Sequence, residues 1–278
     1  MHYLCAMKPV IAMCNIFDQD AERLADFAAA NGFSGIDWSM DPSLPEKRFQ
    51  SLMGSLSGFQ VRYHCRFHGV EIACADRRGD DSLALLMRTV DQVARAGGGH
   101  MTVHSGLGNP TGEGIDLSRA IDNLAVLVAH GKNNGVAVCL ENLTTPLTND
   151  PRIFQQIVGE SGAYATIDIG HAHAVRDMHP LTDSFVRYVL PHRKRILNAH
   201  IYHTEPAGYG HVPPSSLADI SSRLDILCLA ESCNWWVIEL MDPTELLGTR
   251  TLLQEYLERR HLRAGPVRHV TPLPFAAV

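Results

Sequence analysis

The feature that most constrains this chain is a repeated alternation between short apolar runs and longer amphipathic segments. Each short run is followed by a segment in which apolar residues recur every three or four positions, as in Leu83, Leu86, Met87 and Val90. Such alternation is typical of βαβ units that build a parallel sheet. Eight runs predict strands, at Val10–Asn15, Gly35–Trp38, Gln60–Cys65, His100–His104, Val136–Glu141, Ala165–Asp168, Ile196–His200 and Trp236–Glu239.

The segments between these runs contain stop signals but no linker. Glycine-rich stops follow the helical patterns where a chain must tolerate positive φ, at Asn31-Gly32, Gly97–Gly99, Asn133–Gly135 and Gly159–Gly162. Eight βα units without a Pro- or Ser-rich break predict an α/β chain that forms one closed (β/α)₈ TIM barrel over residues 1–260. Residues 261–278 lack periodicity, and we expect an irregular tail over the surface or against a neighbouring subunit, which leaves a homo-oligomer open.

Composition excludes several classes of protein. The 278 residues are 45% hydrophobic and carry a net charge of −6, so no overall basic field indicates nucleic acid binding. Seven scattered cysteines without a C-x-x-C pair favour reduced thiols and a cytoplasmic location. No apolar run approaches the roughly 20 residues of a membrane span, and the first run is too short for a signal peptide, so we expect no membrane contact.

Six consecutive predicted strands end in a histidine or a carboxylate. In a TIM barrel the chemistry lies at these carboxyl ends, where the βα loops converge. Buried together, such charges would be costly unless a cation neutralised them, and imidazoles with carboxylates suit Zn, Mn, Fe or Co. The residues predicted to form this ring are His64, His104, Glu141, Asp168, His200 and Glu239.

Four of these strand ends also carry a family resemblance. Val138–Asn142, Ile167–His171, Asn198–His200 and Val237–Leu240 resemble the xylose-isomerase-like superfamily of TIM barrels, which includes sugar isomerases, sugar epimerases and the endonuclease IV family. The resemblance runs from the first strand to Glu245, about 240 residues. It implies a divalent metal held by Glu141, Asp168, His200 and Glu239.

The endonuclease IV side of the resemblance implies further histidine ligands. His64, His104, His171 and His211 fit positions through which that family assembles three zinc ions. Tyr209 occupies the place of an Asp, so a third ion would lack a carboxylate ligand, whereas a two-metal site bridged by Glu141 would lose nothing. The resemblance therefore implies one to three ions of Zn, Mn or Co.

The sugar-epimerase side fits with departures. Ketose 3-epimerases of this fold carry a Glu after the ligand of the fifth strand and an Arg after the His of the seventh, where this chain has Leu147 and Pro206. A 3-epimerase of that subgroup is therefore not expected. The segment from His200 to Thr204 also departs, because Tyr202 and His203 stand where many isomerase-like members have His-Asp.

Residues around the ring are predicted to contact substrate. We expect His171 and His211 to orient substrate unless they bind a third ion, Asn142 to act as a positioning donor, and Trp38 to form an apolar wall unless it packs in the core. His64 and His104 could likewise contact a substrate hydroxyl instead of a second metal.

These residues support more than one reaction. A sugar isomerase or epimerase removes a proton next to a carbonyl and forms an enediolate, with Glu141 and Glu239 as ligand and base. A dehydratase of a keto-polyol would begin in the same way. The rival is an endonuclease IV-like zinc phosphodiesterase, the one alternative with a nucleic acid partner, although the strand-end loops hold few basic residues. A non-catalytic ligand-binding barrel would not need the Glu141/Glu239 pair. The sequence favours an isomerase or epimerase acting on a small sugar, sugar phosphate or polyol.

Overall fold

The eight predicted strands form a closed parallel barrel in the order β1 to β8. A computed structural model describes residues 8–107, 111–176 and 184–264. Each strand lies within one residue of its prediction at both ends, and β1 closes the ring by pairing with β8, Val10 opposite Trp235. The strands are β1 Val10–Cys14, β2 Gly35–Ser39, β3 Gln60–Cys65, β4 His100–Val103, β5 Ala137–Glu141, β6 Tyr164–Asp168, β7 Ile196–Ile201 and β8 Trp235–Ile238.

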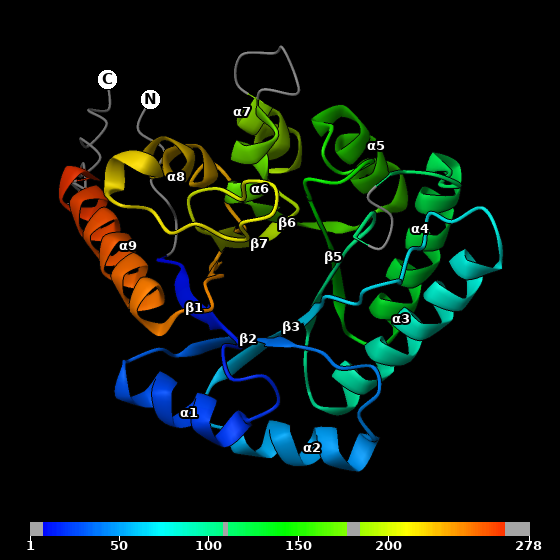
Figure 1. Cartoon of the computed structure of the whole chain (residues 1–278), viewed down its shortest axis with the longest axis horizontal. Coiled ribbons are helices and arrows are strands. Elements are labelled where there is room, and N and C mark those ends of the chain that lie inside the picture. Colours follow the sequence, from blue (N-terminus) through cyan, green and yellow to red (C-terminus); the bar gives the residue numbers. More distant parts are fainter. Residues whose placement is uncertain (1–7, 108–110, 177–183, 265–278) are drawn as a thin grey trace, which may run out of the picture.

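Helices form an outer layer around the barrel (Figure 1). They are α1 Ala21–Ala30, α2 Glu46–Ser55, α3 Arg77–Arg95, α4 Leu117–Asn133, α5 Pro151–Ser161, α6 Ile169–Ala174, α7 Ser184–Val189, α8 Ser221–Leu227 and α9 Pro243–Ala264, with the short 3₁₀ segments η2 Leu190–His192 and η3 Leu217–Asp219. The last helix continues to Ala264, past the expected start of the tail, and residues 265–278 lie outside the described residues. No described helix is both long and apolar enough to cross a bilayer.

Aspartates start several of these helices and glycines follow them. The side chains of Asp20, Asp76, Asp116, Asp150 and Asp168 each accept a hydrogen bond from a backbone N–H in the first turn of α1, α3, α4, α5 and α6. Gly162, at the end of α5, has φ of 76°, and the predicted stops after α1, α3 and α4 also contain a glycine with positive φ. The start of α6 fixes Asp168, a predicted metal ligand, by its capping bond to His171.

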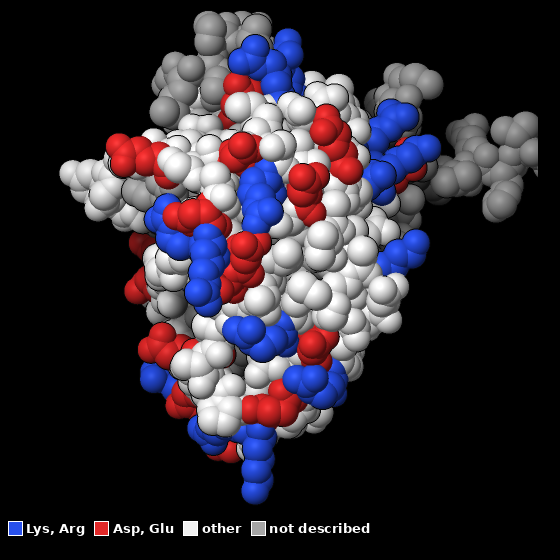
Figure 2. Space-filling view, turned by 90° about the vertical axis from the view of Figure 1, so that its right-hand side faces the viewer, with Lys and Arg blue, Asp and Glu red and all other residues white. Residues whose placement is uncertain are grey.

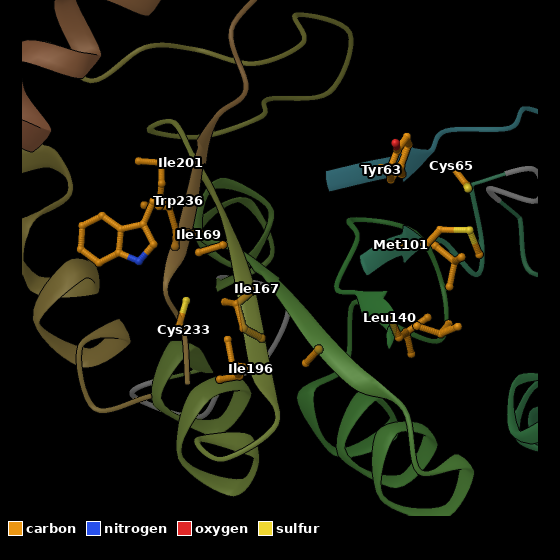
Figure 3. Packing of buried hydrophobic residues seen from close by; sticks show 14 of the residues in the cluster. Tyr63, Cys65, Met101, Leu140, Ile167, Ile169, Ile196, Ile201, Cys233 and Trp236 are labelled. Atoms are coloured by element: carbon orange, nitrogen blue, oxygen red, sulfur yellow. The ribbon is translucent and has the colours of Figure 1, made fainter. Parts of the chain in front are cut away.

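Two sets of side chains fill the molecule. The main hydrophobic cluster lies between the outward face of the sheet and the helices, and includes Met101, Leu140, Ile167 and Trp236 (Figure 3). The inward face is different, since it combines a small apolar cluster around Trp235 with a hydrogen-bonded polar layer. This polar layer consists of Arg62, Thr102, Thr166 and Asn198. Each residue of the polar layer lies two positions before one of the strand-end residues. Because alternate residues of a strand face the same side, the layer lies in the barrel directly beneath the strand ends.

Candidate metal centre

The structure brings the six predicted strand-end side chains together at one end of the barrel. His104 is 9% exposed and the other five are at most 3% exposed. His64 lies on β3, His104 directly after β4, and Glu239 directly after β8, while the remaining three lie at or near the ends of β5, β6 and β7. Strand alternation points all six inward, so that they converge at the barrel axis.

The first ligand group consists of Glu141, Asp168, His200 and Glu239. Nδ1 of His200 lies 3.1 Å from Oε1 of Glu141 and 3.1 Å from Oε2 of Glu239. Oδ2 of Asp168 lies 3.9 Å from the same nitrogen. One donor atom from each of the four residues falls within 4.8 Å of the others, so all four can reach a single cation.

The second ligand group consists of His64, His104 and Glu141. The Nε2 atoms of the two histidines are 2.8 Å apart, and Oε2 of Glu141 lies 3.1 Å from the first and 2.9 Å from the second. Glu141 therefore faces the first group with Oε1 and the second with Oε2, as a bridging carboxylate would.

The donor chemistry of both groups fits a divalent cation. Oδ2 of Asp168 and Nε2 of His200 are buried without a hydrogen-bond partner among the described residues. Three fully buried carboxylates in one cluster need a counter-charge. Imidazole nitrogens with carboxylate oxygens are the ligands that zinc, manganese and cobalt accept. The residues present therefore fit the metal that the sequence leads us to expect.

The charged side chains of the cluster shift one another's pKa values. Burial would raise the pKa of Glu141 and Glu239, but neighbouring histidines, His200 first, hold both well below the usual range. Burial raises the pKa of Asp168 to about 6. Burial would lower the pKa of His200, yet Glu141 and Glu239 raise it well above its usual value. Glu141 and Glu239 thus favour the protonated form of His200.

A third set, the rim group, consists of His171, Glu205 and His211. Nε2 of His171 lies 2.9 Å from one carboxylate oxygen of Glu205, and Nε2 of His211 lies 3.7 Å from the other. The sequence predicts no carboxylate at this position, because Tyr209 stands where the endonuclease IV family has an Asp. The structure corrects that expectation, since Glu205 brings a carboxylate to it, while Tyr209 is 84% exposed.

A hairpin explains how Glu205 and His211 meet. After β7 the chain turns back so that Thr204 and Val212 form an antiparallel bridge, and positive φ at Gly208 and Gly210 forms the tip next to Tyr209. Nδ1 of His211 lies 2.6 Å from the backbone oxygen of Glu239. The hairpin therefore contacts the first ligand group from the solvent side.

Two residues of the predicted substrate contacts are fully buried. The amide of Asn142 exchanges two 2.9 Å hydrogen bonds with the backbone of Asp168, so it positions that predicted ligand. Trp38 is fully buried in the main hydrophobic cluster and presents no surface to a ligand, because the residue before it on β2 takes the inward position.

Three polar residues of the site are not among those predicted from the sequence. Asp37, before Trp38, has Oδ2 3.4 Å from Nδ1 of His64. Arg66, two residues after His64, places Nη1 3.4 Å from Oε1 of Glu239 and keeps 42% of its side chain exposed. Glu205 is the third. Strand parity could have identified Asp37 and Arg66, whereas no periodic signal marks Glu205.

Comparisons with known proteins agree with this architecture. A family model described as "Xylose isomerase-like TIM barrel" matches residues 25–250. MJ0008, an uncharacterized protein of Methanocaldococcus jannaschii, is 30% identical over 178 residues, which is 64% of this chain and 74% of that protein.

Solved structures share the fold at low sequence identity. An L-ribulose 3-epimerase has a TM-score of 0.71 at 17% identity and covers 95% of this chain and 100% of its own. The apo form of a 3-keto-D-glucoside 4-epimerase from E. coli has a TM-score of 0.67 at 18% identity, over 90% of this chain and 100% of its own. At such identities the likeness is one of fold.

Proposed function

Because the chain belongs to the xylose isomerase-like TIM barrel family, we propose that it is a metal-dependent enzyme that isomerises or epimerises a small sugar, sugar phosphate or polyol. The observation that carries the proposal is the first ligand group, in which two glutamates that could move a proton flank a histidine and an aspartate suited to a cation. The epimerases with the same fold support the choice of reaction.

The two glutamates are placed for different tasks. Both oxygens of Glu141 face histidines of the two ligand groups, and only 1% of the residue is exposed. Glu239 faces His200 with Oε2 but faces the partly exposed Arg66 with Oε1. Glu239 is therefore the better placed to take a proton from carbon at Oε1, and Glu141 to join the two ligand groups.

Besides proton transfer, the reaction needs a group that polarises the substrate carbonyl and residues that hold the substrate at the opening of the site. A divalent cation, when bound, supplies the Lewis acid that polarises a substrate carbonyl. Arg66, Glu205 and His211 are the partly exposed members of this neighbourhood, so they would contact the substrate as it enters. Arg66 also lowers the pKa of Glu239, after the larger effects of His200 and His211, and so keeps that carboxylate ionised and ready to accept a proton.

A dehydratase remains a variant of the same proposal. It would use the same proton abstraction at Oε1 of Glu239 and then expel a hydroxyl group from the neighbouring carbon. Its product would have lost one water, so the mass of the product separates it from an isomerase or epimerase.

The second candidate is a zinc phosphodiesterase, and the second ligand group favours it. Two-metal hydrolases hold their ions about 3.5–4 Å apart through a bridging ligand, a role that Glu141 could take. The net charge of −6 does not favour a duplex nucleic acid. On the side of the molecule shown in Figure 2, over the outer helices, basic and acidic side chains are interspersed rather than gathered in a basic stripe.

One experiment separates the two candidates. The metal-loaded protein is incubated in D₂O with a panel of ketoses, aldoses and their phosphates, and proton exchange is followed by NMR. The same preparation is tested for cleavage of an abasic-site oligonucleotide. We expect deuterium at a carbon next to a carbonyl, with no strand cleavage. Strand cleavage without exchange would replace the proposal with the hydrolase.

A further inference from the structure

Asp37 is a buried carboxylate that the proposed reaction does not use. It lies on β2, directed into the barrel, and is 3% exposed. Its Oδ2 atom has no hydrogen-bond partner among the described residues and lies 3.4 Å from Nδ1 of His64. A buried carboxylate oxygen without a hydrogen bond is costly, so Asp37 needs a partner.

The obvious partner, Arg62, is directed elsewhere. Arg62 is opposite Asp37 in the register of β2 and β3. Its guanidinium, however, donates to the backbone oxygen of Leu197 at 3.0 Å and to the side chains of Asn198 and Asn234. It also lies over the ring of Trp235. Asp37 is thus left facing His64, two positions further along β3.

His64 differs in this respect from the other strand-end histidines of the two ligand groups. Its Nε2 atom faces His104 at 2.8 Å and Glu141 at 3.1 Å. Its Nδ1 atom lies 3.4 Å from Oδ2 of Asp37 and, farther away, 3.7 Å from Oε1 of Glu239. Nδ1 of His104 and Nε2 of His200, the nitrogens away from their ligand groups, have no partner among the described residues. Of these three histidines, His64 is the one with a carboxylate behind its ring.

We propose that Asp37 is a positioning residue that holds the Nδ1 proton of His64 and thereby leaves the Nε2 lone pair for a divalent cation in the second ligand group. A carboxylate behind a ligating imidazole fixes its tautomer and ring orientation and strengthens it as a ligand. The inference rests on the proposed function only in that the strand-end cluster binds metal, and it holds for either reaction.

The effect of Asp37 should therefore be specific to one ligand group. Loss of an outer partner of this kind typically lowers metal affinity about 10- to 100-fold. Asp37→Ala should cause a loss of that size in the second group and leave the affinity of the first group within about threefold. Asp37→Asn should lose less than Asp37→Ala, because an amide oxygen still accepts the Nδ1 proton, and its near-identical shape favours folding.

The test is a titration of demetallated protein with Co²⁺ against a competing chelator, followed by the visible spectrum of the bound ion. The matched control is Thr102→Val, which removes a buried 2.8 Å hydrogen bond with Thr166 and a 3.3 Å hydrogen bond from Asn198 beneath the site but changes no predicted ligand. We expect two affinities in the wild type and in the control. In Asp37→Ala one of the two should be reduced while the other is unchanged, and Asp37→Asn should partly recover the reduced one.

Two results would overturn the inference. Unchanged Co²⁺ binding in Asp37→Ala would show that His64 does not depend on Asp37. An equal loss at both affinities in both Asp37 variants, together with a lower melting temperature, would show a general structural role. Wild-type protein that binds no Co²⁺ at all would instead overturn the metal dependence of the proposed function.

Discussion

Glu239 is the residue on which the proposed chemistry depends most directly. Replacing it with glutamine preserves its shape but removes both the proton acceptor and the charge. We expect Glu239→Gln to lower turnover about 10²- to 10⁴-fold, the usual contribution of a general base, and to leave the fold intact. Deuterium exchange into the substrate and the circular dichroism spectrum together check this outcome.

The control for this variant is Glu160→Gln, which makes the same chemical change on an exposed position of α5. It should retain full activity. Normal turnover in Glu239→Gln would remove the assigned role, and then the metal content of the variant would show whether the residue is even a ligand.

His192 provides a residue-scale prediction away from the metal centre. Burial, with a smaller effect of Arg195, lowers the pKa of His192 to about 4, from an ordinary value of 6.5. The folded state therefore resists protonation that the unfolded chain accepts. This contribution to stability is fully present above about pH 6.5 and is lost as the pH falls toward 4, by up to about 3 kcal/mol.

His192→Leu should remove this dependence. The free energy of unfolding of the variant, measured by urea denaturation between pH 7 and pH 4, should fall less steeply than that of the wild type. His68→Leu, at an exposed position, is the control. If the two variants and the wild type lose stability in parallel, His192 is not a source of the acid sensitivity.

At the scale of elements, α6 and β7 approach closely at Gly170. A Cβ atom on Gly170 would overlap the ring of Tyr202, which stacks on His211 with ring centroids 3.9 Å apart. Gly170→Ala should therefore cost about 1–3 kcal/mol by overpacking and should displace His211 from the rim group. Urea denaturation measures the first effect, and the KM for the substrate measures the second.

Gly159→Ala is the matched control, because Gly159 lies in α5 with no atom within 4 Å of the added methyl group. It should be neutral or gain up to about 1 kcal/mol. The double variant Gly170→Ala/Tyr202→Leu should recover part of the lost stability. Strict additivity of the two changes would mean that Tyr202 is not what Gly170 accommodates.

At this scale it is also clear which elements and site residues could be predicted from the sequence. Strand periods and glycine stops are local signals, and they predicted the eight strands to within one residue. Residues alternate between the two faces of β2, so only one of Asp37 and Trp38 can point into the barrel. The prediction that Trp38 contacts substrate was wrong, because Asp37 takes the inward position and Trp38 packs in the core. Glu205 could not be found in this way, because the conformation of the hairpin after β7 depends on contacts with His171 and His211 from other elements.

For the whole molecule, closure of the barrel assembles the site, and the buried charges of the site in turn lower the stability of the barrel. Closure brings residues separated by more than 170 positions, such as His64 and Glu239, to within 3.7 Å. The polar layer beneath them, with the guanidinium of Arg62, supplies hydrogen bonds but no bond to a carboxylate. The ligand groups therefore still require a cation to be balanced, and metal binding must be coupled to folding stability.

Metal removal should accordingly destabilise the entire chain. A ligand that binds only the folded state at 100 times its Kd adds about 2.7 kcal/mol, which for a domain of this size raises Tm by several degrees. Protein stripped with a chelator should melt at a lower temperature than protein reloaded with Zn²⁺ or Mn²⁺, and Asp168→Asn should lose most of this difference. Calorimetry checks the shift, with metal content measured on the same samples. Equal melting temperatures for the stripped and reloaded protein, at confirmed loading, would show that the cluster is already balanced by its own protons and does not need an ion to fold.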